Sequence, residues 1–480
     1  MENSQIMANY TEQDVTRWRY NIKDILYTRE IALNLQGVLR SQNPKLQEFY
    51  EFQQYHNAPA LDRVMHRGIK IDLAKKDELF TQLTALLTDV EKKLEYLIGE
   101  PFNPKSLPQI KAVFKDLLGI KPIIDKKTGN ESFSSGYMLQ YLEQYPIYKP
   151  LITLILEYRS IGVFLRTFVS AKVDDDGRMR TSYNIAGTKT YRLSSRKNPF
   201  GNGANLANIP SKGKIDLKFS LATIEPTEEL ESDESFVVGE YEGITKLPNC
   251  KEFFIPDDGY TFFNADYSGA DAMIVAWDSD CAWLQKFFTT SNEKLYIYIG
   301  SHYLQRELTV HDKEYKLYKQ FIHGTNYGMM EAKAAANANM PLDEARKLRQ
   351  WYFKLCPEIP QWHKRIASDI SSRGYVENIF GARGYFMNKD SPTLLNQAYA
   401  FIPQSTIAIL VNKGLVNIDQ KEKDIQVLLQ VHDALAGQFK TTDLDAPNRI
   451  VKHMSVELPY KRPLVIPVDI TTSAKSYGDC

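Results

Sequence analysis

Cysteine is scarce in this sequence. Four cysteines occur among 480 residues, at positions 250, 281, 356 and 480. They show neither the paired spacing of a zinc site nor the density of a disulfide-rich secreted domain. No apolar run approaches the roughly 18 residues that span a bilayer, and the polar start, MENSQIMANYTEQ, lacks the apolar core of a signal peptide. These absences predict a protein of the reducing cytoplasm with no membrane partner.

The sequence also lacks net charge, because 59 basic side chains balance 59 acidic ones. Residues 216–258, however, contain 12 acidic and 3 basic side chains, which leaves 56 basic against 47 acidic elsewhere, a net charge of +9. That remainder could follow a phosphate backbone. A solvated surface explains it equally well, so charge alone decides nothing. We interpret the acidic stretch 216–246 as an exposed insertion.

A length of 480 residues is enough for several cores, so we expect two to four subdomains. Apolar residues at spacings of three and four indicate a helix over 72–98, with Asp72 as its N-cap and Gly99 and Pro101 at its end. A second helical stretch covers about 136–170.

Strand patterns occur at three places. VDDDGRMRTSYN predicts two strands joined by a turn at Gly177. The chain is then mostly helical from 281 to 373, SRGYVENIFGARGYF predicts a hairpin, and 389–418 predicts one long helix. IQVLLQVHDALAGQF predicts a second hairpin, because two apolar runs flank a polar tip.

Four polar segments could carry chemistry: FFNADYSGAD, KLYKQFIHGTNYGM, QVHDALAGQF and TKTYRLSSRKNPFGNGANLANIP. Alone, each has an ordinary explanation: a helix cap, a solvated helix face, a turn and a loop. Together they suit one chemistry. Carboxylates at the ends of adjacent strands can hold hard divalent cations, and a helix face with a cation and an aromatic ring suits a triphosphate and a base. A pair of metal ions is a standard means of phosphoryl transfer.

The same segments resemble the motifs of the DNA polymerase I family (family A), and within it those of bacteriophage enzymes. TKTYRLSS with NLANIP, DYSGAD, KQFIHGTNYG and QVHDA resemble the family's motifs in the family's order. RGYVENIFGARGYF, AFIPQSTIA, FNPKSLPQI and EYRSIGVFLRTF match as well. The similarity runs from about residue 60 to the C-terminus.

The resemblance implies an α+β right-hand fold with a thumb, a palm built on an antiparallel sheet, and helical fingers. It divides the chain as follows: 1–58, the remnant of an exonuclease domain or docking segment; 59–172, the thumb with the start of the palm; 173–280, the first part of the palm with the insertion 216–246; 281–388, the fingers; and 389–480, the second part of the palm.

The resemblance also implies the reaction and the residues that carry it. A primer 3′-end would be extended with deoxynucleoside triphosphates along a template, in the host cytoplasm if a bacteriophage encodes the chain. Asp266 and Asp433, with the Tyr267 carbonyl, would hold two Mg²⁺ ions, which Mn²⁺ could replace. Lys319 would act in catalysis and meet the triphosphate. The remaining nucleotide-binding positions are Lys316, His323, Tyr327 and Asp271, and those expected to bind primer–template DNA are Arg192, Asn205, Asn208, Gln404 and His432.

Several positions depart from the family's pattern, among them Asn396 and Ala400, which stand where Arg and Asn are frequent. Tyr315 stands where an arginine is usual, His323 replaces an aromatic residue, and Ala434 replaces a glutamate, which removes any third carboxylate. We expect these changes to affect selectivity more than activity. Asp271 stands where a glutamate usually excludes the ribose 2′-hydroxyl, tied to the tyrosine at the Tyr327 position. A helix cap is the simpler explanation of Asp271.

RYNIKDILYTREIAL (19–33) resembles the last motif of the family's 3′→5′ exonuclease, through Tyr20 and Asp24. Because 18 residues precede Arg19, we expect either a trimmed chain or a separate exonuclease polypeptide that docks here; an ordinary amphipathic helix is the alternative. Two rival functions remain: a single-subunit RNA polymerase, and a catalytically silent subunit that binds primer–template.

Overall fold

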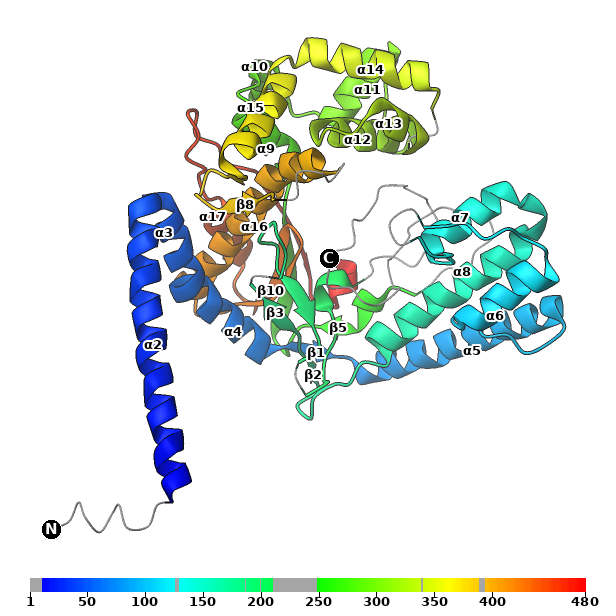
Figure 1. Ribbon diagram of the computed structural model, residues 1–480, viewed down its shortest axis with the longest axis horizontal. Helices are drawn as coiled ribbons and strands as arrows, with labels where there is room; N and C mark the ends of the chain where they lie inside the picture. The colour runs from blue at the N-terminus through cyan, green and yellow to red at the C-terminus, as the bar shows by residue number, and fades with distance from the viewer. Residues whose placement is uncertain are drawn as a thin grey trace.

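The computed structural model describes residues 11–125, 129–185, 187–198, 200–209, 248–337, 340–387 and 393–480. A central sheet lies below a helical lobe, a long helical arm extends to one side, and a single N-terminal helix projects from the other (Figure 1). The acidic insertion expected at 216–246 falls outside the described residues.

The central sheet has four antiparallel strands in the order β11–β6–β10–β9. The strands are β6 (Tyr260–Tyr267), β9 (Ile425–Val431), β10 (Ala434–Lys440) and β11 (Val468–Ser473). β9 and β10 form the hairpin predicted from IQVLLQVHDALAGQF, with His432 and Asp433 at its tip. Their pairing shifts by one residue between Ala436 and Gly437. A Cβ at Gly437 would lie 2.2 Å from the Gln426 carbonyl oxygen, so this bulge requires glycine.

Three helices cover one face of this sheet: α9 (Ala270–Asp278), α16 (Leu394–Lys421) and α17 (Ala446–Met454). Phe263, Ala265 and Tyr267 of β6 belong to the core that these helices complete, whereas Phe262 belongs to a second core shared with the arm. Among the described helices, α16 alone is long and apolar enough to cross a membrane. It is a core helix here, with 72% of its most apolar window buried.

The arm consists of α5 (Leu73–Ile98), α6 (Leu107–Lys111), α7 (Ser135–Gln144) and α8 (Lys149–Val163). The predicted helix 72–98 is confirmed: Asp72 accepts a hydrogen bond from the Lys75 amide, and Gly99 ends the helix at φ +86°. The stretch predicted at 136–170 is α7 and α8, separated by a turn at Pro146.

The helical lobe confirms the helices predicted between 281 and 373. It contains α10 (Ala282–Thr290), α11 (Leu295–Leu304), α12 (Lys313–Asn326), α13 (Glu331–Asn337), α14 (Leu342–Leu355) and α15 (Glu358–Arg373). The hairpin predicted next is β7 (Tyr375–Glu377) with β8 (Arg383–Tyr385). At the N-terminus, α2 (Glu12–Gln42) precedes α3 (Pro44–Glu51) and α4 (Ala58–Arg67).

The hairpin predicted around Gly177 is wrong. β2 (Arg178–Met179) pairs with β1 (Ile69–Ile71), which also pairs with β5 (Phe254–Ile255). The residues before Gly177 form only the turn, because three successive aspartates offer no apolar side chain to a strand pair, whereas Ile69 offers one to Met179. The strand after β2 is β3 (Ser182–Asn184), paired with β4 (Ser194–Arg196).

Candidate active site

Asp266 and Asp433 lie side by side at one end of the central sheet. Asp266 is the next-to-last residue of β6, and Asp433 directly precedes β10. Asp266 pairs with Ala434, and the Tyr267 amide donates to the Asp433 carbonyl over 3.4 Å. His432 turns the chain into this position at φ +51°, a left-handed conformation that histidine adopts more readily than most residues. The strand pairing therefore fixes the two aspartates as neighbours.

Each of the two carboxylates makes ionisation of the other less favourable. Desolvation raises the pKa of Asp266, and the Asp433 carboxylate raises it further. Burial also raises the pKa of Asp433, with the Asp271 charge adding to the rise and Arg192 opposing it. A divalent cation would relieve this repulsion, and oxygen ligands suit Mg²⁺. The residues therefore fit the expected metal. Within the described residues, no three acidic, His or Cys side chains are grouped closely enough to hold a metal ion by themselves.

Asp469 is a third carboxylate that sequence reasoning missed. It lies directly opposite Asp266 on β11, while Ala434 lies opposite Asp266 on β10. Residues opposite each other in an antiparallel pair share a face, so the two aspartates lie in one row. Asp469 also raises the pKa of Asp266. The inference that Ala434 removes any third carboxylate is therefore incomplete; only the register of β11 reveals the other one.

Tyr267 has its ring on the opposite face from Asp266. Its hydroxyl donates to the Met454 carbonyl over 2.5 Å, and the residue is buried. This anchor fixes the end of β6 in the core, so only the Tyr267 backbone is available to the site.

Arg192 is directed at the carboxylate pair. Its Nη2 lies 3.5 Å from Asp433 Oδ1, and its buried Nε finds no hydrogen-bond partner among the described residues. An unsatisfied guanidinium N–H beside a reaction centre is suited to an incoming acceptor. His432, exposed at the hairpin tip, lies close enough to Arg192 and Asp433 for their charges to act on its pKa.

Helix α12 presents the expected nucleotide-binding residues. Lys316 and Lys319 are exposed, and Lys319 is near enough to Asp266 to oppose the rise in its pKa. The His323 ring lies 4.4 Å from the Tyr327 ring, measured between centroids. Burial lowers the pKa of His323, so this side chain is neutral at neutral pH.

The contact expected between Asp271 and Tyr327 is present. Tyr327, directly after α12, donates its hydroxyl to Asp271 Oδ1 over 2.5 Å. Burial and then the Asp271 charge raise the pKa of Tyr327 well above its usual value, so the phenol remains a donor. Asp271 lies in the first turn of α9, yet no side-chain cap hydrogen bond forms at the start of that helix. The simple cap explanation of Asp271 therefore fails.

The remaining expected DNA-binding residues lie on separate elements. Asn205 Oδ1 accepts a 2.5 Å hydrogen bond from the Ser195 hydroxyl, which in turn accepts from the Ala207 amide over 3.0 Å. Asn208 is exposed at the end of a 3₁₀ turn (Leu206–Asn208), and Gln404 is a partly exposed residue on the largely buried α16.

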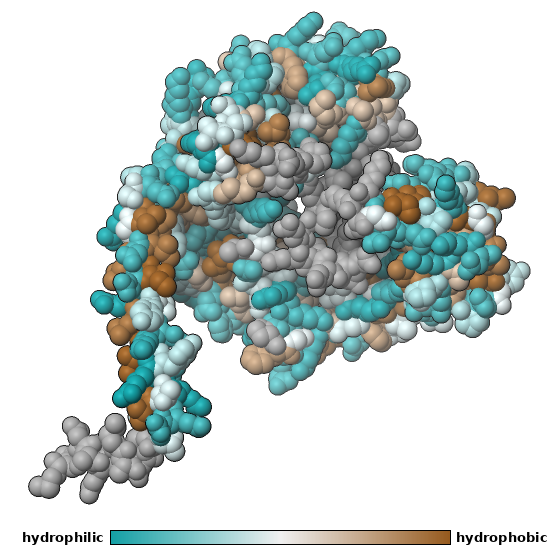
Figure 2. Space-filling view, in the orientation of Figure 1, coloured by the Kyte–Doolittle hydropathy of each residue, from teal (hydrophilic) through white to brown (hydrophobic). Residues whose placement is uncertain are grey.

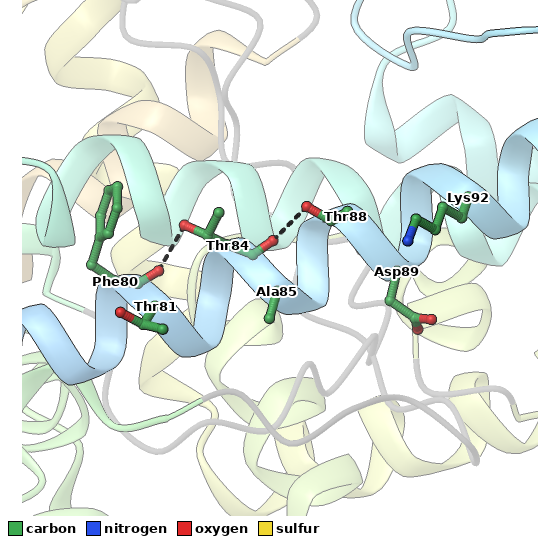
Figure 3. Close-up of a pocket in the computed structure, with 7 residues that line it drawn as sticks. All are labelled: Phe80, Thr81, Thr84, Ala85, Thr88, Asp89 and Lys92. Atoms are coloured by element: carbon green, nitrogen blue, oxygen red, sulfur yellow. Dashed lines mark hydrogen bonds between the residues drawn. The ribbon is translucent and has the colours of Figure 1, made fainter.

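A hollow on the arm lies apart from this site. It follows α5 and is lined by Phe80, Thr81, Thr84, Ala85, Thr88, Asp89 and Lys92 (Figure 3). The Thr84 and Thr88 hydroxyls donate to carbonyls of their own helix over 2.7 and 3.0 Å. Those hydroxyl protons are already used, so the hollow carries no comparable chemistry.

A solved structure described as the "POL domain of Pol1 from M. smegmatis complex with DNA primer-template and dNTP" shares this fold. It superposes with a TM-score of 0.71 at 22% identity, over 89% of this chain and 71% of that one. The protein thus has the right-hand polymerase fold of the α+β class, with the central sheet as the palm, the helical lobe as the fingers and the arm as the thumb.

Sequence comparison defines the family. The profile of DNA polymerase family A matches residues 74–478. "DNA polymerase I, thermostable" of Thermus filiformis is 24% identical over 96% of this chain and 52% of its own length. The Thermus aquaticus protein of the same description is 25% identical over 92% and 49%. The chain belongs to DNA polymerase family A and spans about half the length of these curated relatives.

Proposed function

We propose that the protein is a DNA-directed DNA polymerase that extends a primer 3′-end with deoxynucleoside triphosphates. The observation that carries the proposal is the carboxylate pair Asp266–Asp433, which lies opposite the Lys319 face of α12 and next to the Asp271–Tyr327 contact. This arrangement combines a place for a divalent cation with a place for a triphosphate.

The proposed mechanism assigns a distinct task to each group. Asp266, Asp433 and the Tyr267 carbonyl would hold two Mg²⁺ ions, which Mn²⁺ could replace. When bound, they supply charge stabilisation at the attacking and leaving oxygens. Lys319, with Lys316 nearby on α12, neutralises the triphosphate and donates a proton as pyrophosphate leaves. His323, kept neutral, and Tyr327 border the incoming nucleotide.

The primer–template would be checked from its minor groove. Correct base pairs present acceptors at similar positions there, so donors can test pair geometry without reading sequence. The Arg192 side chain is partly exposed and offers guanidinium donors for this purpose, and the partly exposed Gln404 offers an amide. Asn205 and Asn208 would contact the duplex beside them, with His432 at the primer end.

Primer extension by the purified chain tests the proposal, with Asp433→Asn as the variant. The substitution removes a metal ligand and no DNA contact, so extension should fall about 10³-fold or more while primer–template binding persists. Residual extension within about tenfold of the parent would contradict the assignment of the metal pair. Absence of extension by the parent, with binding intact, would favour the silent-subunit alternative.

We further propose that α2 docks a separate 3′→5′ exonuclease polypeptide. α2 is 31 residues long and has no buried residue, although ten large apolar side chains between Trp18 and Val38 are exposed. Figure 2 shows hydrophobic side chains, in brown, along the projecting helix. A helix with apolar residues on all sides is normally enclosed by protein. The exonuclease-like residues Tyr20 and Asp24 indicate the kind of partner: a polypeptide that carries further exonuclease carboxylates.

The purified chain alone should therefore leave a mispaired 3′ end intact. A complex purified with its docked polypeptide should remove the mismatch in Mg²⁺, and Asp24→Asn should abolish the removal. Glu30→Gln on the same helix is the matched control and should retain it. Mismatch removal by the chain alone, or a self-associated chain with no second polypeptide, would refute this docking.

We also propose that the chain serves DNA replication in a bacteriophage, within the cytoplasm of a bacterial host. The motif forms DYSGAD and QVHDA support this origin. Recovery of the coding sequence from nuclease-protected virion DNA would test it; finding the sequence only in cellular chromosomes would contradict it.

A further inference from the structure

Lys251 is held at the edge of the catalytic sheet by an aromatic platform. It lies in a 3₁₀ helix (Cys250–Phe253), where its amide donates to the Asn249 side chain over 3.1 Å. Its Nζ lies 4.1 Å from the centre of the Tyr477 ring. That ring stacks on Phe262 of β6, with centroids 5.2 Å apart and planes at 26°. The ammonium is therefore fixed relative to the strand that carries Asp266.

No close carboxylate partner explains this position. Within the described ranges, no acidic oxygen lies within 4.0 Å of Lys251 Nζ, although the side chain is partly buried. Desolvation lowers its pKa, and Cys480 and then the Asp266 charge partly oppose that fall. The Lys251 charge also contributes to lowering the pKa of His432. A partly desolvated cation with only distant opposing charge favours an anionic ligand.

Besides Arg192, two lysines act on the carboxylate pair from different elements. Lys319 is on α12 in the fingers, whereas Lys251 lies in the 3₁₀ helix that directly precedes β5. Figure 1 shows β5 beside β1, where the thumb begins. Two polyanions must meet at Asp266 and Asp433 during the proposed reaction, namely the triphosphate and the primer strand. Lys319 accounts for the first. Because Lys251 lies on a different element, it is available to the second.

We propose that Lys251 Nζ binds a phosphodiester of the primer strand next to its 3′ terminus. This inference rests on the proposed polymerase function and adds a binding residue to it. The Tyr477 ring would orient the ammonium through a cation–π contact, so that little side-chain freedom is lost on binding. His432, whose pKa the Lys251 charge lowers, would lie next to the same phosphate.

Equilibrium binding without metal or nucleotide tests the proposal apart from catalysis. The affinity of Lys251→Gln for a fluorescent primer–template is measured by anisotropy over a series of salt concentrations. Because one phosphate contact is lost, the slope of log affinity against log salt should fall by about one, whatever the sequence. Lys251→Arg should restore the slope. Lys440→Gln is the matched control, because Lys440 pairs with Asp424 at the far end of β10.

Primers with one neutral methylphosphonate linkage locate the contact. Parental affinity should fall when the neutral linkage is one of the last few before the 3′ end, and Lys251→Gln should be insensitive at that linkage alone. An unchanged slope for Lys251→Gln, or equal sensitivity of parent and variant at every linkage, would overturn the proposal. If Lys251→Gln fails to fold, the parent's linkage scan and Lys251→Arg still decide. Failure of the parent to bind primer–template would refute the polymerase function instead.

Discussion

At the scale of single residues, Asp271 and Tyr327 raise the question of sugar selection. Aspartate is one methylene shorter than glutamate, yet its carboxylate reaches the Tyr327 hydroxyl at 2.5 Å. The Tyr327 hydroxyl is thus close enough to bond the shorter Asp271 side chain directly. We propose that this pair covers the 2′ position of the incoming sugar.

Asp271→Ala should lower discrimination against ribonucleotides by at least about tenfold, or about 1.4 kcal/mol, mainly through better ribonucleotide use. Single-nucleotide incorporation with deoxy- and ribonucleotides measures the ratio. Tyr327→Phe is the companion variant, because it removes only the hydroxyl that orients Asp271. An unchanged ratio in Asp271→Ala, accompanied by lower thermal stability, would make Asp271 a purely structural residue.

Lys319→Ala should impair nucleotide use far more than DNA binding. The lysine is exposed on the α12 face toward Asp266, so its charge is available to the triphosphate. We expect kcat/KM for the nucleotide to fall at least about tenfold, with primer–template affinity unchanged. Weaker duplex binding with unchanged nucleotide kinetics would place Lys319 on the DNA instead.

We expect the ionised Asp433 carboxylate to lower the stability of the folded protein when no metal is bound. Its pKa is raised in the folded protein, so the folded state binds the proton more tightly than the unfolded chain. The ionised form therefore costs stability at pH values above the raised pKa, and this cost disappears below the unfolded value. In EDTA at neutral pH, Asp433→Asn should raise the Tm, and Mg²⁺ should stabilise the parent more than the variant. A lower Tm for the variant in EDTA would contradict this sign.

At the scale of elements, the end of α12 depends on a glycine. Gly328 has φ +75°, and a Cβ there would lie 2.6 Å from the Tyr399 ring of α16. That ring stacks on His363, with centroids 4.1 Å apart, so it cannot easily move. The junction that positions Tyr327 therefore admits only glycine.

Gly328→Ala should destabilise the protein by on the order of 1–2 kcal/mol or more, through backbone strain and the clash. Denaturant unfolding measures this change. Gly136→Ala is the control, because Gly136 lies in α7 with no atom within 4 Å of an added Cβ; it should be neutral or stabilising. Equal effects of the two substitutions would show that the contact with Tyr399 is unimportant.

Local sequence patterns predicted most elements, for identifiable reasons. The β9–β10 hairpin and α5 have strong periodicity and clear end residues, including Asp72 and Gly99. The hairpin at Gly177 failed because the partner of β2 is β1, more than a hundred residues earlier. Asp469 and Lys251 were missed for a related reason: only strand register and a ring stack bring them to the site. Local periodicity does not indicate which distant strands pair with each other.

At the scale of the whole molecule, α2 contributes nothing to the core. Removal of residues 1–41 should leave the Tm and primer extension unchanged, because no residue of α2 is buried. Gln42 and Asn43 are kept, since they bond to Arg383 and Glu377. Thermal denaturation and primer extension check this, and a large fall in Tm would mean that α2 supports the polymerase body. The docking proposed for α2 should be lost in the truncated chain.

The order of strands in the central sheet also sets a constraint during synthesis on the ribosome. β6 is bordered by β10 and β11, which follow the whole of the fingers and α16. Loop closure across so much chain is slow, and domains tend to fold from the N-terminus first. The thumb can fold early on the nascent chain. The carboxylate site forms only later, when β10 and β11 bring Asp433 and Asp469 to Asp266. Translation therefore completes the thumb before it completes the carboxylate site, and a chain whose synthesis stops before β9 would lack both Asp433 and Asp469.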